Sequence, residues 1–158
     1  MALKPDRAHY ASDISFFMTA VAERGGIVTI STGGSGAAMD QSAAVVAYAA
    51  NPSGKTPVGV LMSEVVNNDL TRQHRNWHKE EVQVNGKVTI WDDCVVVTNM
   101  FAPSLTITAG DRAYVTVSGL ITNVDFGAAA SPQVGMFLSG KNEDGYAKLR
   151  IRPSHARS

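Results

Sequence analysis

Apolar and β-branched residues recur in short runs along most of the chain, and residues typical of turns separate these runs. β-Branched side chains lose rotamer freedom in helices but fit the half-buried surface of a sheet. Valine, isoleucine and threonine supply 36 residues against 7 leucines, so the composition favours strands over helices. The predicted strands are residues 26–31, 43–49, 58–62, 94–98, 113–118 and 134–139.

The pair Asn85 and Gly86 lies between two stretches of alternating apolar and polar residues. Asparagine and glycine tolerate the positive φ angles of a type I′ turn, which joins the two strands of a tight hairpin. We therefore predict a hairpin over residues 82–90, with Gly86 at positive φ. One face of this hairpin is expected to enter the core through Val82, Val84, Val88 and Ile90.

The N-terminal region has a different spacing. Apolar residues recur there at helical intervals after Asp13, a candidate N-cap, and stop at Gly25 and Gly26; they are Ile14, Phe17, Met18, Val21 and Ala22. We expect one short helix here, preceded by a polar arm over residues 1–13.

These patterns divide the chain into an N-terminal arm and helix (1–25), a β domain (26–151) and a C-terminal tail (152–158). Short, closely spaced strands are typical of small barrels and sandwiches. The predicted fold is therefore mainly β: a small antiparallel β-barrel or sandwich with an N-terminal arm and one short helix.

Charge is balanced and sparse. The 158 residues include 14 Lys plus Arg and 14 Asp plus Glu, which excludes the overall basic field of a dedicated nucleic-acid-binding protein. A charged fraction of 18% is low, so the surface is either rich in Ser and Thr or covered by a partner. No apolar run is long enough to cross a membrane, and the lone Cys94 is expected to pack as a small apolar residue. We expect neither a membrane nor a specific nucleic acid as partner.

Residues 49–56 resemble a phosphate-binding P-loop in which Ala49 replaces the first glycine. Such a site needs a helix to begin at Lys55, so that backbone amides hold the phosphates. Pro57 biases Thr56 away from the helical conformation, and a strand-like run follows. We expect a polar turn, with no phosphate bound at Lys55.

His74 and His78 would share one face of a helix, a spacing that suits a metal ion. No third ligand follows at the spacing of a known motif, so we expect no metal and no other cofactor. The same segment contains Arg72, Arg75 and Trp77. Arginine and tryptophan are enriched at the energetic centres of protein interfaces, so these three residues are predicted to contact a protein partner.

The polar N-terminal arm has too little apolar surface to fix itself. Its charged residues Lys4, Asp6 and Arg7 are therefore predicted to bind a partner, either another protein or a neighbouring subunit.

The C-terminal stretch contains four cations and no acid: Lys148, Arg150, Arg152 and Arg157. A solvated tail is the favoured interpretation, with contact to an acidic partner or nucleic acid as the alternative.

Residues 58–63 and 134–139 resemble each other: each segment has a glycine, then apolar residues and then a serine. Two copies are too few for a solenoid and predict matching strands in a pseudo-symmetric barrel.

We find no enzyme signature in the sequence. The glycines around Ser35 lack the strand-to-helix context of a nucleophile elbow. The acidic pairs at 92–93 and 143–144 lie at predicted turns, where solvated acids are common. We therefore expect a protein without enzymatic activity.

Four short segments between residues 55 and 151 stand in a distinctive order: PVGVL (57–61), VNGKV (84–88), TAGDRAY (108–114) and SG (118–119). This order resembles the capsid decoration, or cement, proteins of tailed bacteriophages. The resemblance implies a small β-barrel that sits on the capsid exterior of the virion as a homotrimer, after synthesis in the host cytoplasm. It also implies that the major capsid protein is the partner and that binding stabilises the shell. The first 54 residues extend beyond the family pattern.

Two alternatives stay open. One is a small β-barrel with a ligand site among its loops, and the other is a tail or baseplate component of a virion. A stable trimer in solution favours the decoration protein, whereas a monomer that a ligand stabilises against heat favours the ligand-binding module.

Overall fold

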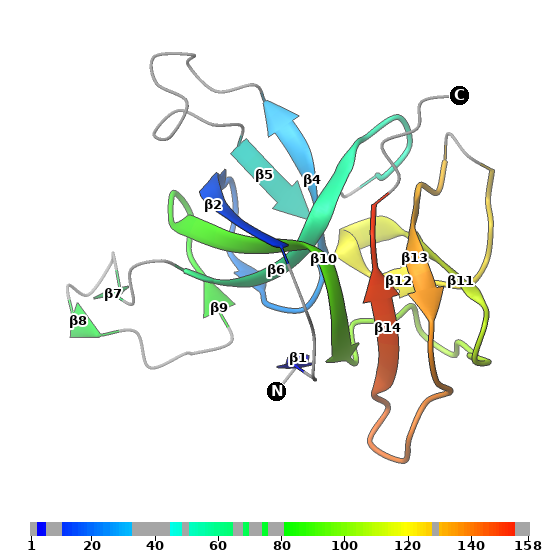
Figure 1. The fold of residues 1–158 in the computed structure, drawn as a ribbon. Coiled ribbons are helices and arrows are strands. Elements are labelled where there is room, and N and C mark those ends of the chain that lie inside the picture. Colours follow the sequence, from blue (N-terminus) through cyan, green and yellow to red (C-terminus); the bar gives the residue numbers. More distant parts are fainter. Residues whose placement is uncertain are drawn as a thin grey trace.

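Strand β10 (Lys87–Thr98) is the longest strand and belongs to two sheets at once (Figure 1). The computed structural model describes residues 3–5, 11–32, 45–48, 51–64, 68–69, 74–75, 81–127 and 130–153. Within this part of the chain, no helix has the length and apolar character that a membrane crossing requires.

The first half of β10 closes a ring of five strands, which we call the barrel. β10 pairs with β2 (Ala11–Met18) on one side and with β6 (Pro57–Glu64) on the other. β4 (Ile27–Thr32) and β5 (Val45–Tyr48) complete the ring between them. β2 and β5 run parallel, and the other neighbours are antiparallel.

The second half of β10 starts an open antiparallel sheet, which we call the second sheet. Its order from β10 outward is β14 (Ala147–Ile151), β13 (Gln133–Phe137), β11 (Arg112–Val115) and β12 (Ile121–Thr122). β1 (Leu3–Pro5) pairs with the other edge of β10.

Short elements complete the described part of the chain. β3 (Ala22–Glu23) pairs with β9 (Glu81–Val82), and β7 (Asn68–Asp69) pairs with β8 (His74–Arg75). The 3-10 turn η1 (Val117–Gly119) connects β11 to β12.

Two apolar cores hold these sheets together. The smaller one includes Met18, Val28, Leu61, Val88 and Ile90, which come from the strands of the barrel. The larger one combines barrel residues with inward-facing residues of the second sheet; among its members are Ile27, Val60, Cys94, Phe137, Leu149 and Ile151. The second sheet therefore covers the outer wall of the barrel formed by β4 and β6. Cys94, 1% exposed, packs as the small apolar residue that the sequence predicts.

The fold class predicted from the sequence is confirmed, because the structure is mainly β and its sheet is nearly closed into an antiparallel barrel. Each predicted strand overlaps an observed one. Most bounds differ by one or two residues, and two strands differ more: residues 94–98 are the end of the much longer β10, and the strand expected over 113–118 gives way to η1 after Val115.

The predicted N-terminal helix is wrong, because Ala11–Met18 is strand β2. Its apolar residues fit strand alternation as well as helical spacing: Phe16 and Met18, two positions apart, both contact the smaller core. The backbone of β2 pairs with β10 on one edge and with β5 on the other. Pairing along two edges overrides the weak local preference for a helix.

The predicted arm is also wrong in part. Leu3–Pro5 pairs antiparallel with Val96–Thr98 of β10, and residues 11–13 belong to β2. These portions of residues 1–13 are thus strands of the chain's own sheets. Residues 6–10 lie outside the described residues.

The turn at Asn85 and Gly86 is confirmed, but the hairpin around it is wrong. The Gly86 N–H donates to the carbonyl of Gln83 at 3.2 Å, and positive φ falls on Asn85 (62°) rather than on Gly86. One left-handed residue at the third turn position is the pattern of a type II turn, not of type I′.

The flanking strands do not pair with each other, because β9 joins β3 while β10 joins β2 and β6. The turn instead docks on the end of β2: Met18 N–H donates to Gly86 O at 3.1 Å, and Asn85 N–H donates to Met18 O at 2.9 Å. Of the predicted core face, Val82, Val88 and Ile90 are buried, whereas Val84 is 41% exposed. Contacts between distant segments, rather than the turn, set the pairing here.

Candidate interaction surface

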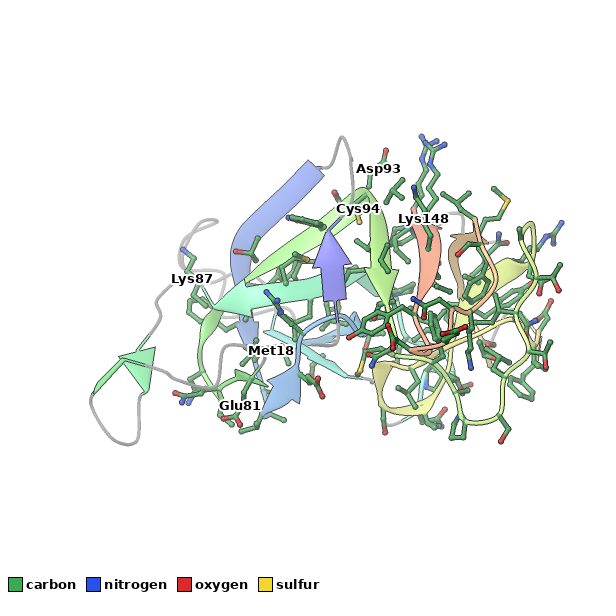
Figure 2. All side chains as sticks on the ribbon, turned by 90° about the horizontal axis from the view of Figure 1, so that it is seen from below. Met18, Glu81, Lys87, Asp93, Cys94 and Lys148 are labelled. Carbon is green, nitrogen blue, oxygen red and sulfur yellow. The ribbon has the colours of Figure 1, made fainter. Side chains whose placement is uncertain are left out.

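The second sheet has one face against the barrel and one face directed away from it. Alternation along β14 separates the two: Leu149 and Ile151 are fully buried in the larger core, while Arg150 between them is exposed. We call the side of the sheet that carries Arg150 the outer face. Figure 2 shows Asp93 and Lys148 toward one side of the molecule, with Met18 and Glu81 toward the other.

Three strands contribute one row of side chains to the outer face. Met136 of β13 lies directly opposite Arg112 of β11 on one side and Arg150 of β14 on the other. Residues paired in this way have Cβ atoms about 4.5–5.5 Å apart and share a face. All three side chains are exposed, so two guanidinium groups flank one thioether. Val95 of β10, opposite Arg150, extends the row.

A second row runs beside the first. Leu138 donates its N–H to the carbonyl of Lys148 at 2.8 Å, and Lys148 is paired with Val97 of β10. Leu138 is 38% exposed and Met136 is 42% exposed, so apolar surface lies among the cations. Arg152 is exposed just beyond β14, where its N–H donates to the carbonyl of Val134 at 2.8 Å.

Within the part of the chain that the structure describes, the side chains of the outer-face arginines have no bonding partner. Among the described residues, no ion pair or side-chain hydrogen bond engages the guanidinium group of Arg112, Arg150 or Arg152. On β10, the acidic residue nearest in sequence to Val95 of the outer face is Asp93, two residues before it. The outer face therefore carries an excess of positive charge.

Asp111 is next to Arg112 in sequence but is held by other groups. Its Oδ2 accepts hydrogen bonds from Asn123 Nδ2 at 2.7 Å and from Thr108 N–H at 3.0 Å. These donors, the Asn123 amide above all, hold the pKa of Asp111 below its ordinary value of 3.8. Asn123 Nδ2 also donates to Thr106 O at 2.9 Å, so the amide fixes the turn before β11 to the end of β12.

Asp92, Asp93 and Cys94 mark the point where β10 passes from the barrel to the second sheet, and pairing with β2 is irregular between Trp91 and Asp93. Burial, and then the charges of Asp93 and Asp92, raise the pKa of the Cys94 thiol to about 12. A thiol with such a pKa is a poor nucleophile and a poor metal ligand at neutral pH. The described residues hold no cluster of three or more His, Cys, Asp or Glu that suits a metal ion.

The structure places only some of the predicted partner-binding residues. Lys4 lies on β1 opposite Val97, so its register position continues the second row of the outer face. Arg75 lies on β8 opposite Asn68, and His74 is opposite Asp69, so these two residues form a strand and not a helix. Asp6, Arg7, Arg72, Trp77 and His78 lie outside the described residues.

The P-loop resemblance around Lys55 is a turn, as predicted. Lys55 N–H donates to Pro52 O at 3.0 Å, Gly54 adopts φ 69°, and Ser53 N–H donates to Asn51 Oδ1 at 3.1 Å. Strand β6 begins at Pro57, so no helix follows Lys55.

Sequence reasoning missed the outer face. The interpretation of residues 148–151 as part of a solvated tail is wrong, because they form β14 between β13 and β10. Alternation of Lys148, Arg150 and Arg152 with Leu149 and Ile151 was the available signal. It is typical of a strand with one charged and one buried face.

A second set of exposed apolar residues lies before and after β12 in the chain. Val117 lies in η1 and is 52% exposed, while Val124 and Phe126, just after β12, are 45% and 62% exposed. Single exposed apolar residues are ordinary on a protein surface, but several within one short stretch of chain make that stretch a candidate for a protein contact.

Comparison with protein-family models gave no match to this chain, and comparison with curated proteins gave no matching relative.

Proposed function

We propose that the protein is a structural virion protein that binds the outside of a phage capsid as a decoration protein and stabilises the shell. The outer face of the second sheet is the observation that carries this proposal. It presents arginines that have no side-chain partner among the described residues, together with exposed Met136 and Leu138, and arginine and methionine are enriched in protein interfaces. A backbone held on paired strands loses little freedom when a partner binds.

The phage assignment rests on the resemblance. Its four segments lie at the start of β6, in the turn leading into β10, in the turn leading into β11 and at η1. All four therefore belong to the framework of turns and strands, which is compatible with the small β-barrel of decoration proteins.

The proposed unit on the capsid is a homotrimer. Val117, Val124 and Phe126 supply apolar surface for contact between subunits, since subunit interfaces are more apolar than ordinary surface. Sedimentation equilibrium at micromolar concentration tests this point. We expect the mass of three chains, and a persistent mass of one chain contradicts the trimer.

The capsid role is tested with undecorated shells of the phage that encodes the protein. We expect purified protein to bind at a fixed number of copies per shell, counted from band intensities after gel filtration of the complex. Bound shells should also melt at a higher temperature in calorimetry than bare shells, since a ligand that binds only the intact form stabilises it. No binding to shells contradicts the proposed function.

A further inference from the structure

We propose that the outer face of the second sheet docks onto an acidic surface of a partner protein, with Arg112 and Arg150 binding carboxylates and Met136 filling the apolar gap between them. Under the proposed function, on which this assignment of the partner rests, that acidic surface belongs to the capsid shell.

The arrangement of the row supports a carboxylate partner. Arg112 and Arg150 lie on either side of Met136 in register on three adjacent strands, so their Cα atoms stand about two strand spacings, roughly 10 Å, apart. Each guanidinium has a planar fork of donors that matches a carboxylate. Neither group has an acidic partner among the described residues, so docking breaks no ion pair within this part of the chain.

The sheet also presents these groups on a rigid base. On the opposite face, Phe137 and Leu149 are fully buried and lie directly across from each other. Backbone pairing fixes β14 on both edges, to β13 and to β10. A docking partner therefore meets a preformed pattern of charge.

The same face favours a protein over a nucleic acid. Met136 and Leu138 contribute apolar surface between the cations, which a protein side chain covers but a phosphate backbone does not. Tyr114 of β11 is only 7% exposed, and no other described aromatic residue lies on the outer-face positions of these strands. Exposed aromatics for base stacking, which are common in single-strand binding, are thus missing from this part of the described surface.

The test compares charge and apolar variants of the full chain. The double variant Arg112→Gln/Arg150→Gln should bind undecorated shells at least about tenfold more weakly than the wild type, as expected for hot-spot arginines. The control Lys55→Gln/Lys141→Gln removes the same charge from exposed turns and should bind like the wild type. Circular dichroism and thermal unfolding of each variant establish that the fold is retained.

A second probe separates this inference from the proposed function. Poly-L-glutamate immobilised on a sensor should bind the wild type and release it as salt rises, and the arginine double variant should lose this binding. If the wild type binds poly-L-glutamate through these arginines but does not bind shells, the docking chemistry stands and the capsid assignment falls. Equal binding of the double variant and the wild type to both probes overturns the docking surface.

Met136→Ala distinguishes a protein partner from a nucleic acid. It should weaken binding to shells and leave unchanged any binding to a DNA duplex, because it removes apolar contact and no charge. Tighter binding of the wild type to DNA than to poly-L-glutamate at the same salt concentration would replace the protein partner by a nucleic acid.

Discussion

Gly59 and Gly135 occupy the same position in two similar three-stranded arrangements. Gly59 lies in β6, between β4 and β10, and Gly135 lies in β13, between β11 and β14. A Cβ at Gly59 would collide with the backbone carbonyl of Trp91, and a Cβ at Gly135 would collide with that of Arg150. Each glycine thus permits a close approach of a neighbouring backbone in one half of the molecule.

Replacing either glycine with alanine should destabilise the protein. We expect Gly59→Ala and Gly135→Ala each to cost about 3 kcal/mol, the upper end for an overpacked core, because the obstacle is backbone rather than a flexible side chain. Urea unfolding of each variant against the wild type measures this. Gly140→Ala is the matched control, since its nearest contact, the Ile107 carbonyl, is 3.2 Å from the added Cβ. Equal midpoints for all three variants contradict the close approach.

The internal similarity of residues 58–63 and 134–139 predicted matching strands, and both segments are the middle strand of an antiparallel trio. The collision that requires glycine was not visible in the sequence. It depends on which carbonyl lies opposite, and Trp91 and Arg150 are far away in the chain.

Asn85 is the residue for which backbone conformation decides the cost of substitution. Asn85→Val should lower stability by roughly 1–3 kcal/mol, because a β-branched residue resists φ 62°. Asn85→Gly is the control and should stay within about 1 kcal/mol of the wild type. Thermal unfolding provides the comparison, and an unperturbed midpoint for Asn85→Val would mean that the turn has another conformation.

The same turn shows where sequence reasoning reaches its limit. The chemistry of Asn85 and Gly86 is local, so the turn could be predicted. Pairing of β9 with β3, and of β10 with β2, depends on contacts across many residues that no local pattern contains. The prediction for the N-terminal strand failed for a related reason. Ile14, Phe17 and Met18 fit helical spacing while Phe16 and Met18 fit strand alternation, and only pairing with β10 and β5 chooses between the two.

The outer face was predictable only in part. Alternation along β14 identifies Arg150 as exposed between two buried residues. Arg112 and Met136 join it through the register of three strands, which the sequence does not reveal. Lys4, chosen from the sequence for its charge, lies in register with this face for the same long-range reason.

The bridge between Asn123 and Asp111 should be measurable as a pH effect. The pKa of Asp111 is lowered in the folded protein, so its charged form adds stability above the ordinary pKa of 3.8, and this contribution is lost as pH falls through the lowered pKa. Asn123→Ala should raise the Asp111 pKa toward 3.8, as followed by the carboxyl chemical shift in NMR titration. Asp111→Asn should be less stable than the wild type at pH 6, where the wild type has the charged form. The free energies of unfolding of the two proteins should converge at pH 2. An Asp111 titration unchanged by Asn123→Ala would contradict the bridge.

Cys94 should make the protein less stable in alkali. Its pKa rises from 9.0 to about 12 on folding because burial, and then Asp93 and Asp92, disfavour the thiolate. A folded-state pKa above the unfolded value means that the contribution is complete below pH 9 and is lost progressively between pH 9 and pH 12.

Cys94→Ala isolates this contribution, since the other ionisable side chains are the same in both proteins. The variant should be less stable at pH 7, by about 1 kcal/mol for the lost packing of a small side chain, but its stability should fall less steeply from pH 9 to pH 12. Iodoacetamide at pH 8 gives a second readout: it should leave native Cys94 unmodified and alkylate it once urea unfolds the chain. Parallel stability curves for the two proteins above pH 9, or rapid alkylation of the native thiol, would show that Cys94 is not held in the core between the barrel and the second sheet.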